Sequence, residues 1–65
     1  MISFDASSVH IEDVIQILLI ESTVVRCILK NAVVECSGTN MHVHSLSDHE
    51  LVIAGRIKAV VLNEK

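Results

Sequence analysis

The feature that most constrains this chain is the alternation of apolar and polar side chains in its second half. Val34 and Cys36 share one parity, and Glu35 lies between them at the other. The alternation returns a few residues later, with Met41 and Val43 set against His42 and His44. Because successive side chains of a strand point to opposite faces, this pattern predicts strands with one face in a core.

Further runs in the sequence are rich in β-branched residues, as strands prefer. They cover residues 23–30, 32–37, 51–54 and 57–62. Glycine and asparagine tolerate positive φ, and polar clusters favour loops, so both mark boundaries between strands. Boundaries are predicted at residues 38–40, 45–50 and 55–56, with a short reversal at Lys30 and Asn31.

Residues 11–20, with the sequence IEDVIQILLI, fit two structures. Ile11, Val14, Ile15 and Leu18 would form one stripe of a helix, but the remaining apolar residues would then surround that helix on nearly all sides. A strand buried on both faces accommodates them better. We therefore predict an all-β fold, a small antiparallel meander forming a sandwich or open barrel, in a single domain spanning residues 1–65. The alternative is an α+β fold with helix 11–20.

The apolar content is high for so short a chain. Of the 65 residues, 51% are hydrophobic and Phe4 is the one aromatic residue. A domain of this size buries only roughly 60% of the surface of its unfolded chain, so an isolated monomer is marginally stable. The excess indicates either self-association or a partner surface, or simply a dense aliphatic core.

Charge and the sequence of the first residues restrict the partners. The net charge is −3, and five Lys and Arg residues are scattered among eight Asp and Glu residues. Such a balance argues against nucleic-acid binding, which needs phosphate-directed cations. The start MISFDASS lacks the features of a signal peptide, and no apolar run approaches the length of a membrane span. We expect a cytoplasmic protein without direct membrane insertion, and a position peripheral to a membrane stays open.

The histidines offer the one candidate metal site. His42 and His44 would lie on the same side of a strand, about 6–7 Å apart. With His49 they could bind Zn²⁺ or Cu²⁺, which gives a metal-binding or metal-sensing module as the alternative function. Parity instead places these imidazoles in solvent, so we predict no metal, no cofactor and no catalytic residues. Cys27 and Cys36 fall at inward parity, where free cysteine packs as a small hydrophobic residue.

Apolar residues that occur at both parities define a predicted contact surface. It combines the second face of residues 14–20 with the outer faces of neighbouring strands, and we expect it to form a homo-oligomer. Its members are Val14, Leu18, Ile20, Val24, Ile28, Val33 and Val52.

The segment SGTNMHVHSLSDHELVIAGRIKAVVL resembles the C-terminal half of the YabP/YqfC family of small sporulation proteins. Two family patterns of apolar residues and glycine carry the resemblance. The first falls on Gly38, Met41, Val43 and Leu46, and the second on Leu51, Ile53, Gly55, Arg56, Ile57 and Val60. The chain departs from the family upstream, where Ile20 and Glu21 replace a Phe-Asp pair and Asp13 and Ala32 stand at usual glycine positions.

The resemblance implies a non-catalytic protein made during spore development by endospore-forming bacteria. It implies action through protein–protein assembly, beside a membrane-bound sporulation protein or in spore envelope formation. The expected location is then the cytoplasm of the mother cell or of the developing spore. The family patterns contain no catalytic residues to transfer.

Overall fold

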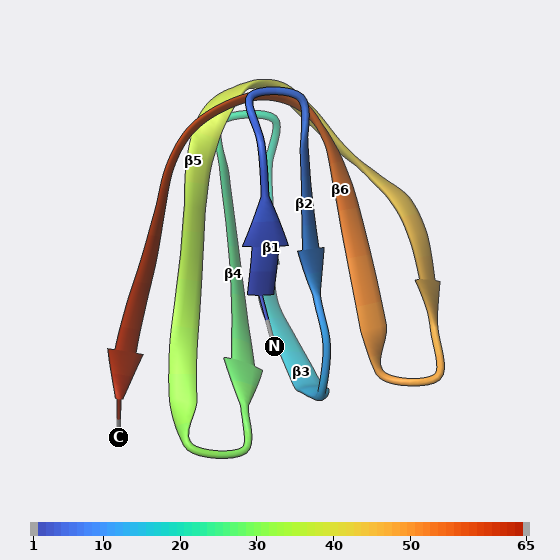
Figure 1. Ribbon diagram of the computed structural model, residues 1–65, viewed down its shortest axis with the longest axis vertical. Coiled ribbons are helices and arrows are strands. Elements are labelled where there is room, and N and C mark those ends of the chain that lie inside the picture. The colour runs from blue at the N-terminus through green and yellow to red at the C-terminus, as the bar shows by residue number, and fades with distance from the viewer. Residues whose placement is uncertain (1, 65) are drawn as a thin grey trace.

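The computed structural model describes residues 2–64, which form one antiparallel sheet of six strands (Figure 1). The strands are β1 (Ile2–Phe4), β2 (Ser8–Ile11), β3 (Val14–Ile20), β4 (Val24–Leu29), β5 (Ala32–Ser47) and β6 (Glu50–Glu64). Their order in the sheet is β1-β2-β6-β5-β4-β3. The all-β prediction is confirmed, and helix 11–20 is wrong, because those residues lie in β2, β3 and the link between them. Residues 2–64 thus contain no helix that could cross a membrane.

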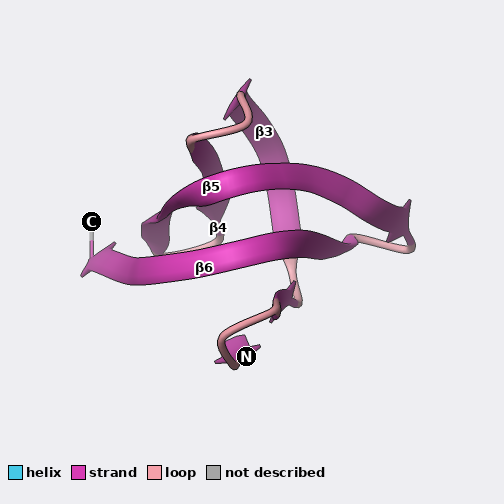
Figure 2. Cartoon of the chain, turned by 90° about the horizontal axis from the view of Figure 1, so that it is seen from above, coloured by secondary structure: helices cyan, strands magenta, loops and turns pink. Residues whose placement is uncertain are grey.

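The two longest strands, β5 and β6, bend near their middles and fold the sheet over on itself (Figures 1 and 2). The bend creates two layers. Layer A contains β3, β4, residues 32–37 of β5 and residues 59–64 of β6, and layer B contains β1, β2, residues 50–54 of β6 and residues 41–47 of β5. The end strands β1 and β3 do not pair with each other, so among residues 2–64 the barrel stays open.

Both layers turn one face into a single apolar core. Paired residues of neighbouring strands share a face, so the buried pairs identify the inner side of each layer. Layer B contributes Val9, Ile11, Leu51, Ile53 and Met41, and layer A contributes Val14, Val25, Cys27, Val34 and Cys36. The buried core of residues 2–64 therefore consists of aliphatic side chains, one methionine and two cysteines.

The sheet contains an internal repeat. Hairpin β1–β2 lies against the first part of β6 as hairpin β3–β4 lies against the first part of β5. The pairs Val9–Ile53 and Ile11–Leu51 in layer B correspond to Val25–Cys36 and Cys27–Val34 in layer A. The sequence carries a faint signal of this repeat, an apolar-x-apolar-x-glycine pattern at Val34, Cys36 and Gly38 and again at Leu51, Ile53 and Gly55.

Each bend contains one glycine that the neighbouring backbone leaves no room to replace. A Cβ atom on Gly38 would lie 2.1 Å from the carbonyl oxygen of Arg56. Gly55 has a φ of 148°, and a Cβ atom there would lie 2.7 Å from the carbonyl oxygen of Asn40. The chain does not end a strand at either glycine, so the predicted boundaries at residues 38–40 and 55–56 are wrong. The glycines instead let long strands bend.

The turns of the two hairpins hydrogen-bond to these bends. The amide of Gly55 donates to the carbonyl oxygen of Ser7 at 3.1 Å, and the amide of Gly38 donates to that of Thr23 at 3.1 Å. The Asp5 carboxylate orders the first turn by accepting from the amides of Ser7 and Ser8. These hydrogen bonds hold the pKa of Asp5 below its usual value.

The loop predicted for residues 45–50 is shorter than expected. β5 continues to Ser47 and β6 begins at Glu50, so Asp48 and His49 alone connect them. Both residues have positive φ, 49° and 64°, as in the tight turns that join twisted antiparallel strands. The reversal at Lys30 and Asn31, between β4 and β5, is confirmed.

Alanine at either bend glycine tests the close approach of the two strands. We expect Gly38→Ala and Gly55→Ala each to lower the free energy of unfolding by about 2 kcal/mol or more, since the backbone must move to admit a Cβ atom. Urea unfolding followed by circular dichroism measures the change. Ser37→Ala, at a partly exposed neighbouring position, serves as the control with an expected effect within about 0.5 kcal/mol. Equal stability of Gly38→Ala and Ser37→Ala would contradict the close approach of β5 and β6 at Gly38.

Candidate interaction surface

Apolar side chains gather on the outer face of layer A. Ile28 lies opposite Val33 across the β4–β5 ladder, and Val24 lies on the same face of β4. These three side chains are partly buried within the layer. Val61, which is 48% exposed, extends the face onto β6 in the row that contains Glu35. The side that faces away from the core is therefore largely aliphatic, as the surface of a protein that meets a partner often is.

One ion pair lies in the middle of this face. Arg26 Nε donates to Glu35 Oε2 at 2.9 Å, from β4 to the opposite residue on β5. The Arg26 and Glu35 side chains are 49% and 39% exposed, so solvent screens the pair and it adds less than about 1 kcal/mol to stability. Its fixed charges can orient a partner more than they stabilise the fold.

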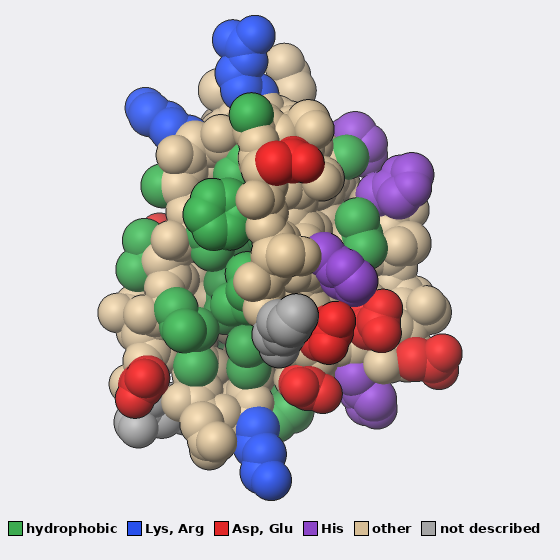
Figure 3. All heavy atoms as spheres, viewed as in Figure 1, with side chains coloured by type: hydrophobic (Ala, Val, Ile, Leu, Met, Phe, Trp, Pro, Cys, Tyr) green, Lys and Arg blue, Asp and Glu red, His purple; other side chains and the backbone are tan. Residues whose placement is uncertain are grey.

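The equivalent face of layer B is mostly polar, although its Val52 corresponds to Glu35 of layer A. By the internal repeat, Val24 corresponds to Ser8, Ile28 to Glu12 and Val33 to Glu50. His10 Nε2 and Glu50 Oε2 are 3.2 Å apart on that face. Figure 3 shows the histidine side chains on the right of the molecule with a group of acidic side chains around the lowest of them, while most of the green apolar surface lies to their left. The same strand framework thus carries an apolar face on one layer and a polar face on the other.

The residues of the predicted contact surface do not all lie together. Leu18 and Ile20 on β3 are exposed, and Val24, Ile28 and Val33 face outward on layer A. Val52 lies on the outer face of layer B, in the row that contains His10 and Ser45.

Val14 is wrongly assigned to that surface. Its side chain is only 5% exposed and packs in the core, where Val14 pairs with Leu29. The register of β3 shifts between Val14 and Gln16. Simple alternation along β3 therefore fails, because a bulge moves the following side chains to other faces.

Sequence reasoning missed exposed apolar residues at the end of the chain. Val61 and its neighbour Leu62, which is 52% exposed, lie on opposite faces of β6. The signal was present in the sequence as apolar residues at both parities of AVVL, the same signal that identified Val24 and Ile28.

The candidate metal ligands lie in different settings. His42 and His44 are exposed on β5, as parity predicts. His49 occupies the β5–β6 turn, where its Nδ1 lies 3.2 Å from the carbonyl oxygen of Val14 and its own carbonyl oxygen accepts from the Val14 amide at 2.8 Å. His49 therefore ties the turn to the start of β3. Within residues 2–64, no three His, Cys, Asp or Glu side chains are grouped as metal ligands would be.

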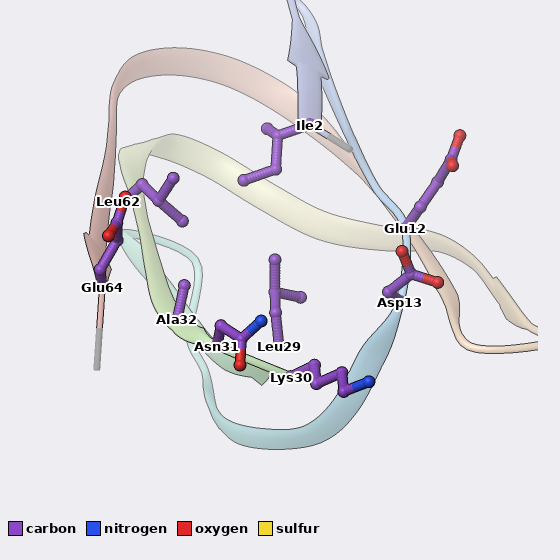
Figure 4. A pocket seen from close by; sticks show the side chains of 9 residues that line it. All are labelled: Ile2, Glu12, Asp13, Leu29, Lys30, Asn31, Ala32, Leu62 and Glu64. Carbon is purple, nitrogen blue, oxygen red and sulfur yellow. The ribbon is translucent and has the colours of Figure 1, made fainter.

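A cavity of about 570 Å³ opens at the end of the core, between β1 and the last residues of β6. Figure 4 shows Ile2 and Leu29 pointing toward each other from opposite walls, with Leu62 at a third side. Glu12, Asp13 and Lys30 lie at the rim. The cavity is an extension of the apolar core to the place where the sheet fails to close.

Cys27 and Cys36 are free and buried on the inner side of layer A, as predicted. Burial raises the pKa of both thiols, and that of Cys36 reaches about 11 with a smaller contribution from neighbouring Cys27. Thiolate is the reactive form of cysteine, so both side chains are chemically protected in the folded chain.

Comparison with models of known protein families, with curated proteins and with solved structures found no match to this chain.

The buried Cys36 thiol gives a pH dependence of stability with a defined sign. Its pKa is about 11 in the folded chain and near 9.0 without burial, so above pH 9 the unfolded chain loses this proton first. The free energy of unfolding should therefore fall as pH rises from about 9 to about 11. Urea unfolding between pH 8 and pH 10.5 measures the slope. Cys36→Ala should be less stable at pH 8 but should show a shallower fall, and equal slopes in the two proteins would contradict the assignment.

Proposed function

We propose that this chain is a non-catalytic assembly protein that docks through the outer face of layer A. One observation carries the proposal: Val24, Ile28 and Val33 occupy positions at which the equivalent half of the same sheet has Ser8, Glu12 and Glu50. The two layers share a core and a strand framework, so folding alone does not require the aliphatic residues. Contact with another protein gives them a role.

The energetics of such a contact are those of aliphatic burial. Removal of apolar surface from water stabilises by roughly 25 cal/mol per Å². Val61 brings the most exposed aliphatic side chain to this face, and Ile28 and Val33 form its centre. The Arg26–Glu35 ion pair places two opposite charges within this face, and these charges set the orientation of the partner.

The first expected partner is a second copy of the chain, which makes the protein a homo-oligomer. The second is a membrane-bound sporulation protein, with this chain in the cytoplasm of the mother cell or developing spore and peripheral to the membrane. Support for the sporulation role comes from the YabP/YqfC resemblance. Gly38 and Gly55 of its patterns are the residues at the bends, and Asp13, at a usual glycine position, has a φ of 65°. The backbone of Asp13 therefore lies in the region of positive φ that favours glycine.

Outer-face substitutions test the assembly role. Val33→Glu gives layer A the residue that layer B has at Glu50, and we expect it to weaken self-association by about ten- to hundredfold, since a carboxylate would be buried in the contact. Light scattering after size-exclusion chromatography measures the mass across a concentration series. Val52→Glu on the outer face of layer B is the matched control and should leave the mass unchanged.

Unchanged circular dichroism and melting temperature in both variants would show that the fold tolerates the carboxylate. A wild-type chain that stays monomeric at high concentration would remove the homo-oligomer. A Val33→Glu protein with wild-type mass would remove the outer face of layer A as the contact.

Spore formation tests the biological role. In the sporulating host of the chain, replacement of the gene by the Val33→Glu allele should reduce the number of heat-resistant spores as a deletion does, while the Val52→Glu allele should behave as wild type. Equal spore numbers in the deletion and the wild type would disprove the sporulation role. The proposed contact through the outer face of layer A would not be affected by that result.

A further inference from the structure

Within residues 2–64 the folded sheet has four unpaired edges, and they differ in how well they could accept another strand. β1 has only three residues. β3 has register shifts after Val14 and after Ile17, and residues 41–47 of β5 include a shift between Val43 and Ser45. Bulges and short strands are devices that protect a sheet edge from further pairing. These three edges are therefore poor templates.

Residues 59–64 of β6 form the exception. They pair with residues 32–37 of β5 without any register shift. On the other side, β2 pairs only with residues 51–54 of β6, so within residues 2–64 the last part of the strand has an unpaired edge. Figure 1 shows this part of β6 at the left margin of the molecule. Val61 and Leu62 leave apolar surface exposed on both faces of this edge strand.

The sequence of this strand is complementary to itself in antiparallel orientation. When two copies of this strand pair about Val61, Val60 of each copy faces Leu62 of the other and Ala59 faces Asn63. Two aliphatic pairs then flank the central Val61 pair, and such cross-strand pairs stabilise sheets. Lys58, at the register shift that ends the regular run, then lies next to Glu64 of the other copy. Antiparallel pairing of identical strands also satisfies the two-fold symmetry of a closed dimer.

We propose that the occupant of this edge is a second copy of the chain, paired antiparallel through residues 59–63 and centred on Val61. Layer A of each copy then continues into layer A of the other, and the two apolar outer faces become one surface. The dimer rests on the proposed assembly role and supplies its first step, since a doubled face offers a partner twice the contact area.

Cysteine cross-linking tests the register. Val61→Cys places a thiol opposite its own copy, at the spacing that a disulfide spans, so mild oxidation should give a covalent dimer on a non-reducing gel. Ala59→Cys should not cross-link alone, because residue 59 faces residue 63, but a mixture of Ala59→Cys and Asn63→Cys proteins should. Native Cys27 and Cys36 are buried and do not compete. Equal cross-linking of Val61→Cys and Ala59→Cys, or none in any of them, would overturn the pairing.

Charge exchange tests the same register without cysteine. Lys58→Glu and Glu64→Lys should each weaken the dimer about tenfold, because each brings like charges together at both ends of the paired strands. The double variant Lys58→Glu with Glu64→Lys should restore the wild-type dissociation constant, measured by analytical ultracentrifugation. A double variant no tighter than the single variants would contradict the proposed proximity of Lys58 and Glu64.

The edge pairing and the outer-face contact can be disproved independently of each other. Val33 lies one strand in from the β6 edge, opposite Asn63, and its side chain is on the sheet face and not on the edge. The combination of Val33→Glu with Val61→Cys should therefore still cross-link while larger assemblies are lost. Loss of the cross-link in Val61→Cys with larger assemblies retained would overturn the edge pairing and preserve the outer-face contact.

Discussion

The close backbone contact between β5 and β6 at Gly38 and Gly55 is the constraint on which the rest of the structure depends. Each glycine sits where a Cβ atom would meet the other strand, and each donates its amide to the turn of a neighbouring hairpin. These contacts let two long strands bend without interruption. The bend turns one six-stranded sheet into two layers that share a core, which a flat sheet of this size could not enclose.

The internal repeat separates what the fold requires from what is free to vary. Inner positions are aliphatic or cysteine in both layers, because both layers supply the same core. Outer positions diverge, with Ile28 and Val33 in layer A against Glu12 and Glu50 in layer B. The edges diverge in the same way, since β6 ends in a regular strand while the matching part of β5 has a bulge. Both differences make layer A the side suited to contact.

Alternation predicted the all-β class, the inward cysteines and the outward His42 and His44, because side chains of an uninterrupted strand must change faces at each residue. It failed where that premise fails. A bulge after Val14 separates the face of this core residue from the faces of the residues that follow it, and Gly38 bent a strand that it was expected to end. Of the apolar residues on the outer face of layer A, Ile28 and Val33 were predicted to face outward from their parity, whereas Val61 was overlooked although its strand shows the same signal.

The sequence by itself determined that the chain forms strands, which side chains of β4 and early β5 enter the core, and that 51% of its residues are hydrophobic. Those are consequences of local geometry and composition. Only the tertiary structure decided that the strands bend at the glycines, that two hairpins repeat around them, and which edge stays unpaired. Backbone contacts between residues far apart in the chain set these features, and the local side-chain pattern carries only a faint signal of the repeat.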